Sequence, residues 1–198
     1  MAKTGQDSKV GGLESIVTAL PREKGRLPPV ELWDPPFCGD IDMKIEADGT
    51  WLYQKTPIGR PALVKLFSGI LKREGDKYYL VTPVEKVGLV VVDAPFLAVE
   101  LKVEHAGDQV LVFRTNVDDW VEAGPGHALK FVQEPSTGGL KPYVHVRREL
   151  WAKVTRALFY DLVALGEERS VGGKQMFGVA SKGEFFAMAE ASALKEFA

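Results

Sequence analysis

The sequence predicts an α+β protein made of two small packed subdomains, built on a duplicated strand-helix-strand unit with a mostly antiparallel sheet. Most apolar runs are short, rich in β-branched residues and separated by Gly and Pro turns. The segment from Asp48 to Lys86 contains in turn a hairpin, an amphipathic helix and a strand. A fainter version of this order recurs between residues 143 and 181, and this recurrence suggests the duplication.

Composition limits the classes of protein to consider. The chain has 198 residues, of which 45% are hydrophobic, and this is enough for one globular domain or two small ones. The chain has 25 Lys and Arg residues and 27 Asp and Glu residues, which gives a net charge of -2. This balance disfavours nucleic acid or an anionic membrane as a partner. The single cysteine, Cys38, excludes an intrachain disulfide, and no apolar run could span a bilayer or form a signal peptide. We therefore expect a cytoplasmic protein.

The first 26 residues are predicted to be an appendage with polar, disordered residues 1–9 and a short helix over Gly12–Leu20 that Pro21 ends. Two Pro-Pro pairs then bracket an extended segment anchored by Trp33. The alternation from Asp40 to Glu46 predicts a half-buried strand. An Asp-Gly turn returns the chain as a second strand over Thr50–Tyr53.

An amphipathic helix is predicted from Pro61 to Leu71, because apolar residues recur there at helical spacing. A strand over Tyr78–Thr82 follows, and it completes an N-terminal α+β subdomain over residues 27–86.

The C-terminal subdomain is expected over residues 87–186, β-rich with one central helix. Its predicted strands cover 88–92, 96–103, 109–115 and 129–132. A short strand at 143–147 then leads into a helix whose stripe contains Trp151, Val154 and Leu158, and a strand over Phe177–Ser181 follows. The alanine-rich end, Phe185–Phe197, predicts a C-terminal helix, so that residues 187–198 form a helical tail.

The two strand-helix-strand units align when Arg60 is placed opposite Arg147. The identity is low and amphipathic helices align by chance, so duplication and chance both remain open.

No motif for catalysis, a metal or a cofactor is complete. No histidine is tied by sequence to Cys38 as a base, and the residues around Ser181 lack the first glycine of a hydrolase elbow. The S-V-G-G-K-Q segment lacks the Ser or Thr and the first glycine of a phosphate loop. Acidic residues between Asp40 and Asp48 could gather a cation, but a solvated strand edge explains them better. We assign no catalytic residue, metal site or cofactor.

Basic residues at two predicted helix starts form the strongest candidate site. Arg60 and Arg147 each stand just before a helix, where free N–H groups favour anions, and Lys65 and Arg148 lie close by. The alternative is that these arginines pair with carboxylates and only tie the units together. Aromatic residues that could stack a base beside them, and a histidine that could project into a cleft, are Trp51, Tyr53, Tyr143 and His145.

Several ordered motifs resemble one bacterial family. They are P-P-V-E-L-W-D-P-P-F-C-G, D-G-T-W-L-Y-Q-K-T-P-I-G-R, Y-Y-L-V-T-P-V-E-K, V-D-A-P-F, R-T-N, P-Y-V-H-V-R and G-V-A-S-K-G. Together they span about Leu27 to Phe186 and are similar to the family called domain of unknown function 1285. The resemblance implies a duplicated α+β core whose C-terminal part is similar to pleckstrin-homology folds. It also implies a nucleotide-like ligand in an interdomain cleft and a role in signal transduction. Lys55-Thr56 departs from the Gly-Ser more usual in the family.

Three hypotheses for function follow. The first is a non-enzymatic regulatory protein that binds an anionic or nucleotide-like ligand at the subdomain interface. The second is a protein-interaction module that uses a sheet edge or the pleckstrin-like half to bind another polypeptide. The third is an enzyme acting on a phosphorylated small molecule, suggested only by the arginines and nearby carboxylates.

Overall fold

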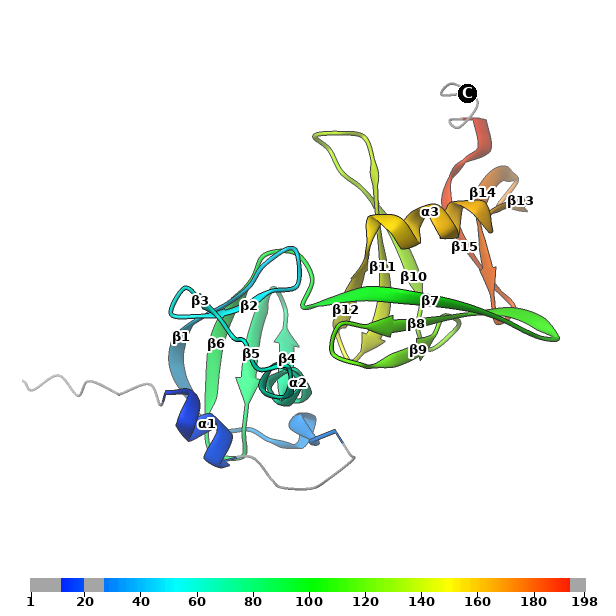
Figure 1. The fold of residues 1–198 in the computed structure, drawn as a ribbon. Helices are drawn as coiled ribbons and strands as arrows, with labels where there is room; N and C mark the ends of the chain where they lie inside the picture. Colours follow the sequence, from blue (N-terminus) through cyan, green and yellow to red (C-terminus); the bar gives the residue numbers. More distant parts are fainter. Residues whose placement is uncertain (1–11, 20–26, 193–198) are drawn as a thin grey trace, which may run out of the picture. The chain divides into compact units, whose positions relative to one another are not determined.

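The computed structural model describes residues 12–19 and 27–192, which form two compact units. We call them the N-terminal unit, up to Val92, and the C-terminal unit, from Asp93. Both units are built mainly of sheet, with helices added, so the protein has the predicted α+β class with two subdomains (Figure 1). In the described part of the chain, no helix is long and apolar enough to cross a membrane.

A six-stranded sheet forms the N-terminal unit, in the order β3-β2-β1-β6-β5-β4. All neighbouring strands run antiparallel except the central pair β1 and β6, which run parallel. Each half of the sheet is thus a three-stranded meander. The strands are β1 (Phe37–Ile45), β2 (Trp51–Tyr53), β3 (Thr56–Pro57), β4 (Leu71–Glu74), β5 (Lys77–Val81) and β6 (Lys86–Val91). The helices are α1 (Leu13–Ala19), a single 3-10 turn η1 (Val30–Leu32) and α2 (Pro61–Gly69).

The C-terminal unit repeats this topology. Its six-stranded sheet has the order β10-β11-β12-β7-β8-β9, again with two antiparallel meanders joined by one parallel pair, β12 and β7. The strands are β7 (Phe96–Ala106), β8 (Asp108–Thr115), β9 (Trp120–Glu122), β10 (Leu129–Gln133), β11 (Leu140–Arg147) and β12 (Leu150–Val154). The two halves of the chain are therefore duplicated as whole six-stranded sheets.

This duplication does not align Arg60 with Arg147, and that prediction was wrong. Arg60 precedes α2, which connects the two meanders of the N-terminal unit. The equivalent connection in the C-terminal unit is the short loop 123–128 between β9 and β10. Arg147 instead ends β11, and β12 follows it after two residues. The apolar stripe of one helix aligned the two units incorrectly, whereas the order of their strands aligns them along the whole sheet.

The predicted helix after Arg147 begins nine residues later, as α3 (Arg156–Ala164). Leu150, Ala152 and Val154 are buried while Trp151 and Lys153 are half-buried, and this is the period of a strand. Trp151 and Val154 lie on opposite faces of β12, but both are apolar and their spacing of three residues also fits a helix. Pairing with β11 and β7 stabilises the strand, and the extended residue Thr155 then begins the helix.

The predicted C-terminal helix was also wrong up to Glu190, whereas the last two described residues, Ala191 and Ser192, are helical. Residues Glu184–Glu190 form strand β15, which joins β13 (Glu167–Val171) and β14 (Lys174–Ser181) in a three-stranded sheet. Pairing with β14 outweighs the helix propensity of the alanines. The last residues of the predicted helix lie outside the described residues, as do residues 1–9.

Two smaller differences concern the N-terminal unit. The segment predicted to be extended around Trp33 contains the 3-10 turn η1, and its anchor is the fully buried Val30. Leu71 begins β4 instead of ending α2, although it is buried as predicted. The likeness of the C-terminal part to pleckstrin-homology folds stays a prediction.

Candidate functional site

Arg60 and Lys65 lie on the exposed side of α2. Arg60 is the N-cap residue of α2 and has extended backbone angles, and Pro61 occupies the first helical turn as predicted. No side chain caps this helix start, and the first turn holds no acidic residue. Both Arg60 and Lys65 are exposed. The structure therefore retains a basic helix N-terminus in the N-terminal unit.

Trp51 does not lie on an accessible surface. It is 2% exposed in the core of the N-terminal unit, so its ring cannot stack on a ligand in this conformation. Tyr53, two residues along β2, is half-buried. Of the predicted stacking residues in the N-terminal unit, Trp51 and Tyr53, the structure leaves only Tyr53 partly accessible.

In the C-terminal unit, alternation on β11 places Tyr143 and His145 on one face of the sheet. The register with β12 shifts between His145 and Arg147, so Arg147 lies opposite the buried Leu150 instead of continuing that face. Arg147 pairs with the carboxylate of Asp119 through its Nη1 atom, and its guanidinium carbon lies 4.8 Å from the centre of the Phe96 ring. Its side chain is only 11% exposed. This is the alternative in which the arginine pairs with a carboxylate, although the carboxylate differs from those nearest in sequence.

The neighbouring Arg148 has a different role from the one predicted. It adopts a positive φ of 52° in the turn between β11 and β12, and its carbonyl oxygen contacts Nε2 of His145. The other ring nitrogen of His145, Nδ1, lies 3.1 Å from the carbonyl oxygen of Gly126. His145 therefore links the turn at Arg148 to the loop at Gly126.

Tyr143 and Lys153 both hold Asp93, the first residue of the C-terminal unit. The Tyr143 hydroxyl donates to Oδ1 of Asp93 at 2.7 Å, and Lys153 Nζ donates to Oδ2 at 2.8 Å. Burial alone would raise the pKa of the Asp93 carboxyl, but these two hydrogen bonds outweigh it and hold that pKa below its usual value. Burial and the Asp93 carboxylate raise the pKa of Tyr143 far above its usual value. Tyr143 is 9% exposed, so this cluster fixes the chain and leaves little of the ring for stacking.

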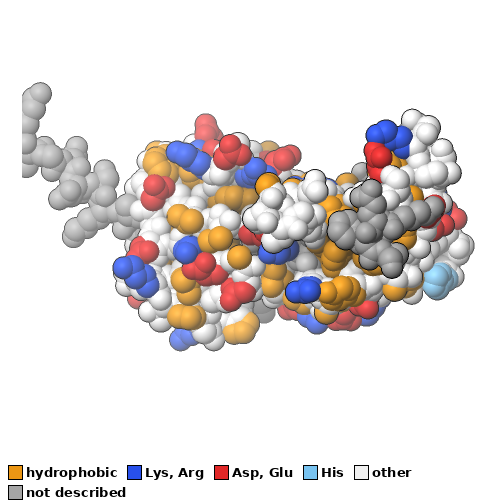
Figure 2. Space-filling view, turned by 90° about the horizontal axis from the view of Figure 1, so that it is seen from above, with side chains coloured by type: hydrophobic (Ala, Val, Ile, Leu, Met, Phe, Trp, Pro, Cys, Tyr) orange, Lys and Arg blue, Asp and Glu red, His pale blue; other side chains and the backbone are white. Residues whose placement is uncertain are grey.

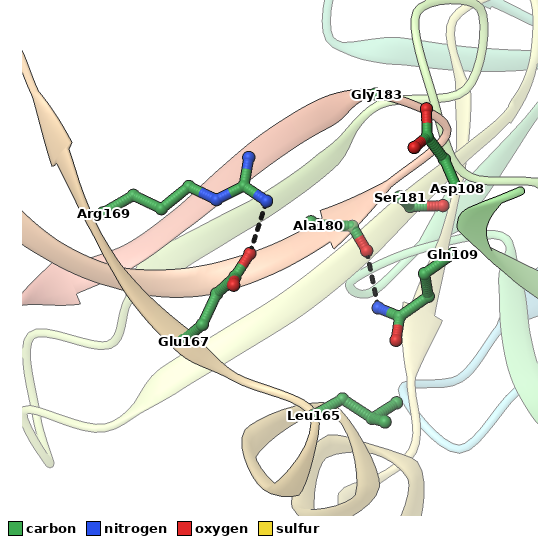
Figure 3. Close-up of a pocket in the computed structure, with 8 residues that line it drawn as sticks. All are labelled: Asp108, Gln109, Leu165, Glu167, Arg169, Ala180, Ser181 and Gly183. Carbon is green, nitrogen blue, oxygen red and sulfur yellow. Dashed lines mark hydrogen bonds and ion pairs between the residues drawn. The ribbon is translucent and has the colours of Figure 1, made fainter.

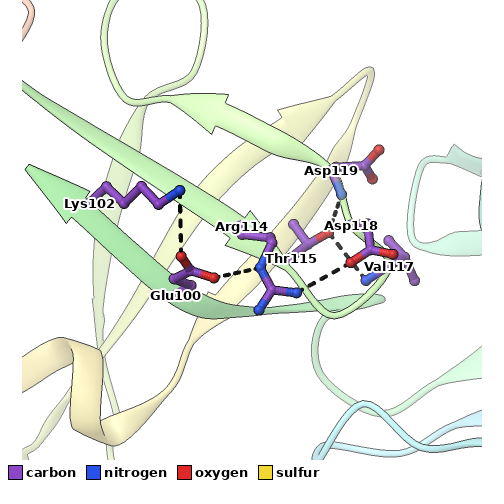
Figure 4. Close-up of polar contacts among 7 residues, drawn as sticks. All are labelled: Glu100, Lys102, Arg114, Thr115, Val117, Asp118 and Asp119. Atoms are coloured by element: carbon purple, nitrogen blue, oxygen red, sulfur yellow. Dashed lines mark hydrogen bonds and ion pairs between the residues drawn. The ribbon is translucent and has the colours of Figure 1, made fainter. Parts of the chain in front are cut away.

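The Arg114-Thr115-Asn116 motif ends β8 and begins the turn that follows, and Figure 4 shows Arg114 and Thr115 there. The buried Thr115 hydroxyl accepts hydrogen bonds from the N–H groups of Val117 at 3.3 Å and Asp119 at 3.0 Å. Arg114 donates to Glu100 at 2.7 Å, and Asn116 Oδ1 accepts from the Leu97 N–H at 3.0 Å. The motif thus closes a turn and ties it to β7.

Ser181 has a comparable structural role at the end of β14 (Figure 3). Its fully buried hydroxyl donates to the carbonyl of Ala123 at 2.7 Å and accepts from the Leu111 N–H at 2.9 Å. Lys182, with a φ of 53°, and Gly183, with a φ of 78°, then turn the chain into β15. The V-A-S-K-G motif therefore attaches the three-stranded sheet to β8 and to the loop after β9.

Cys38, the other candidate nucleophile, donates a weak hydrogen bond from its thiol to the carbonyl of Pro36 at 3.4 Å. Within the described ranges, no three His, Cys, Asp or Glu side chains are grouped as metal ligands. On the face shown in Figure 2, Lys and Arg side chains are interspersed with Asp and Glu, so that face presents no large patch of one charge.

A large apolar hollow lies in the C-terminal unit and was not predicted. This groove has a volume of about 780 Å³ and lies between α3, β10 and the strands β14 and β15. The rings of Phe131 and Phe159 lie 6.3 Å apart at a tilt of 40°. Its apolar walls are formed by Phe131, Leu140, Phe159, Val163, Phe177 and Met188.

Only part of this groove could be recognised in the sequence. Phe159 and Val163 widen the apolar stripe around Leu158, and this pattern indicates a helix that packs on more than one side. Phe131 and Met188 could not be linked to them, because they come from strands about thirty residues away on either side. Only the tertiary structure brings them together.

The comparisons with known proteins agree with this fold. Two family models match the chain: the DUF1285 N-terminal domain over residues 28–94 and the DUF1285 C-terminal domain over residues 95–188. Their border lies within two residues of the border between the two units.

Two crystal structures of DUF1285 family proteins are similar to the chain. The protein from Silicibacter pomeroyi DSS-3 is 51% identical, with 93% of this chain and 98% of that chain covered and a TM-score of 0.84. The protein from Shewanella baltica OS155 is 30% identical, with 63% of this chain and 91% of that chain covered and a TM-score of 0.50. No curated protein matches the chain. With models for both halves and a relative of this similarity, the chain belongs to the family called domain of unknown function 1285.

Proposed function

We propose that this protein is a non-enzymatic binding protein whose C-terminal unit holds a segment of another polypeptide. The observation that supports this most strongly is the apolar groove of about 780 Å³ beneath α3. Aromatic side chains and a methionine in a concave surface are typical of sites that bind apolar side chains of a partner. Val163 is 40% exposed at this groove, so part of its apolar wall is open to solvent.

A displayed library of random 12-residue peptides, selected on the immobilised full chain, tests this proposal. The selected peptide is then titrated by fluorescence anisotropy against the wild type, Val163→Asp and Ala164→Asp. Val163 lines the groove, whereas the exposed Ala164 beside it does not, and both carboxylates would stand at the same end of α3. We expect Val163→Asp to weaken binding at least tenfold and Ala164→Asp to change it less than twofold. Failure to enrich any peptide, or equal affinities for the two variants, would refute the proposal.

The anionic or nucleotide-like ligand predicted from sequence is a second candidate, supported by the basic start of α2. Arg60 is exposed at a helix start without a side-chain cap or an acidic residue, and Lys65 lies one turn further on. Arg147 does not add to this support, because it pairs with Asp119 in a strand.

A thermal-shift screen against nucleotides, cyclic forms included, tests this second candidate. Stabilisation of the wild type that Arg60→Ala removes, and that Lys77→Ala on the exposed start of β5 retains, would support it. No shift over the panel, or equal loss in both variants, would count against an anion site at α2.

A further inference from the structure

The outer edge of β10 carries backbone groups that no strand of the described chain pairs with. β10 is the last strand of its sheet, and its one paired neighbour there is β11. In an antiparallel pair, residues that exchange two hydrogen bonds alternate with residues that exchange none. Phe131 lies opposite Pro142, which has no N–H to donate, so this pair is of the second kind.

The flanking hydrogen bonds agree with that assignment. The N–H of His145 donates to the carbonyl of Ala128 at 2.9 Å, and the N–H of Glu134 donates to the carbonyl of Gly139 at 2.7 Å. Even-numbered residues of β10 therefore bond to β11. The N–H and C=O groups of the odd-numbered residues Phe131 and Gln133 point away from β11, toward the open edge.

The same two residues line the apolar groove, so the open edge and the groove form one continuous surface. Across the groove lies β15, which passes beside β10 but belongs to the other sheet. The register of β15 shifts between its pairs with Phe177 and Gly178, and the extra residue, Met188, lines the groove. Such bulges bend a strand away from its neighbours, which suits the rim of an opening.

The charge of the groove favours an uncharged apolar occupant. Among the residues that line it, only Glu190 is formally charged, and its carboxylate is paired with Lys174. A nucleotide or another anion would find no cation on these walls. An apolar side chain would be accepted, and the open backbone groups of β10 would bind peptide groups.

We infer that the groove binds an extended segment of another polypeptide, which adds as a strand to the free edge of β10. The peptide backbone pairs with Phe131 and Gln133, and alternate apolar side chains enter the groove against Phe159 and Met188. This inference rests on the proposed function and specifies its mode: an extended chain recognised through its backbone, with period-two side-chain specificity.

Methylation of the peptide backbone tests this mode. Each amide nitrogen of the selected peptide is methylated in turn, which removes one N–H and keeps the side chain. We expect binding to fall at least tenfold at alternate positions and to change little at those between, because only every second N–H of an added strand faces β10. Loss with a helical spacing, or no loss at any position, would refute strand addition.

Variants of Gln133 test the protein's side of the hydrogen bonds between β10 and the peptide backbone. Gln133→Pro removes an outward N–H without removing a bond to β11, whereas Gln133→Ala removes the side chain and keeps the N–H. We expect the proline variant to lose at least tenfold in affinity and the alanine variant less than threefold, with far-UV circular dichroism confirming that both fold.

The outcomes separate the two claims. A peptide that binds both Gln133 variants equally but loses affinity in Val163→Asp shows a groove that recognises side chains alone, so the proposed function stands and strand addition fails. No selectable peptide would refute both.

Discussion

Ser181 should be among the residues on which the stability of the C-terminal unit depends most. Ser181→Ala removes a hydrogen bond to the Ala123 carbonyl at 2.7 Å and one from the Leu111 N–H at 2.9 Å. Ser181 is 0% exposed, so water cannot replace it without rearrangement. An unsatisfied buried polar group costs about 1–3 kcal/mol, so we expect a total loss of about 2–4 kcal/mol.

Urea denaturation followed by tryptophan fluorescence measures this loss. With a slope of about 2 kcal/mol per molar urea, the midpoint should fall by roughly 1–2 M without a change of slope. Ser170→Ala, on the exposed strand β13, is the matched control and should change the free energy of unfolding by less than about 0.5 kcal/mol. A Ser181→Ala midpoint equal to that of the control would refute the structural role we assign to the V-A-S-K-G motif.

Three further predictions concern other contacts. Arg147→Ala should destabilise the protein by about 2–4 kcal/mol. In a double-mutant cycle with Asp119→Ala, the two losses of stability should couple by about 1 kcal/mol or more. Additive losses of stability would contradict the ion pair between Arg147 and Asp119. The lowered pKa of Asp93 means that its contribution to stability is present above its ordinary pKa of 3.8 and is lost as the pH falls through the lowered value. Asp93→Asn should therefore reduce the melting temperature at pH 7 and make it depend less on pH in acid. A melting temperature that falls in acid as steeply in the variant as in the wild type would contradict the hydrogen bonds assigned to Asp93. Gly178→Ala would place a Cβ atom 2.3 Å from the carbonyl oxygen of Phe186, so we expect loss of folded protein in a solubility and circular dichroism assay; a wild-type melting temperature would contradict this packing.

The sequence predicted the elements of the N-terminal unit well, because local signals agree there with tertiary packing. Period-two alternation, the Asp-Gly turn and Pro61 at the first helical turn each give the correct element. Beyond Arg147 the local signals conflict with the tertiary structure. β12 carries apolar residues on both faces, and β15 contains alanines but pairs within a sheet. Neither pairing of these strands can be seen in a short window of sequence.

The candidate site was predicted only in part, for a related reason. Arg60 has the position expected, because a helix start is set by local sequence. The partner of Arg147 is Asp119, 28 residues earlier, and the groove combines β10, α3 and β15. Contacts of this range follow from the order of strands in the sheet, which one sequence did not reveal.

Hydrogen exchange at the edge of β10 is the most direct test of polypeptide binding in the groove. Amide exchange is measured by NMR in the free full chain and with the selected peptide at saturation. We predict at least tenfold slower exchange at Phe131 and Gln133, whose N–H groups face the open edge, and little change at Lys130, whose N–H already faces β11. Unchanged exchange at Phe131 and Gln133 with the peptide bound would contradict strand addition to β10.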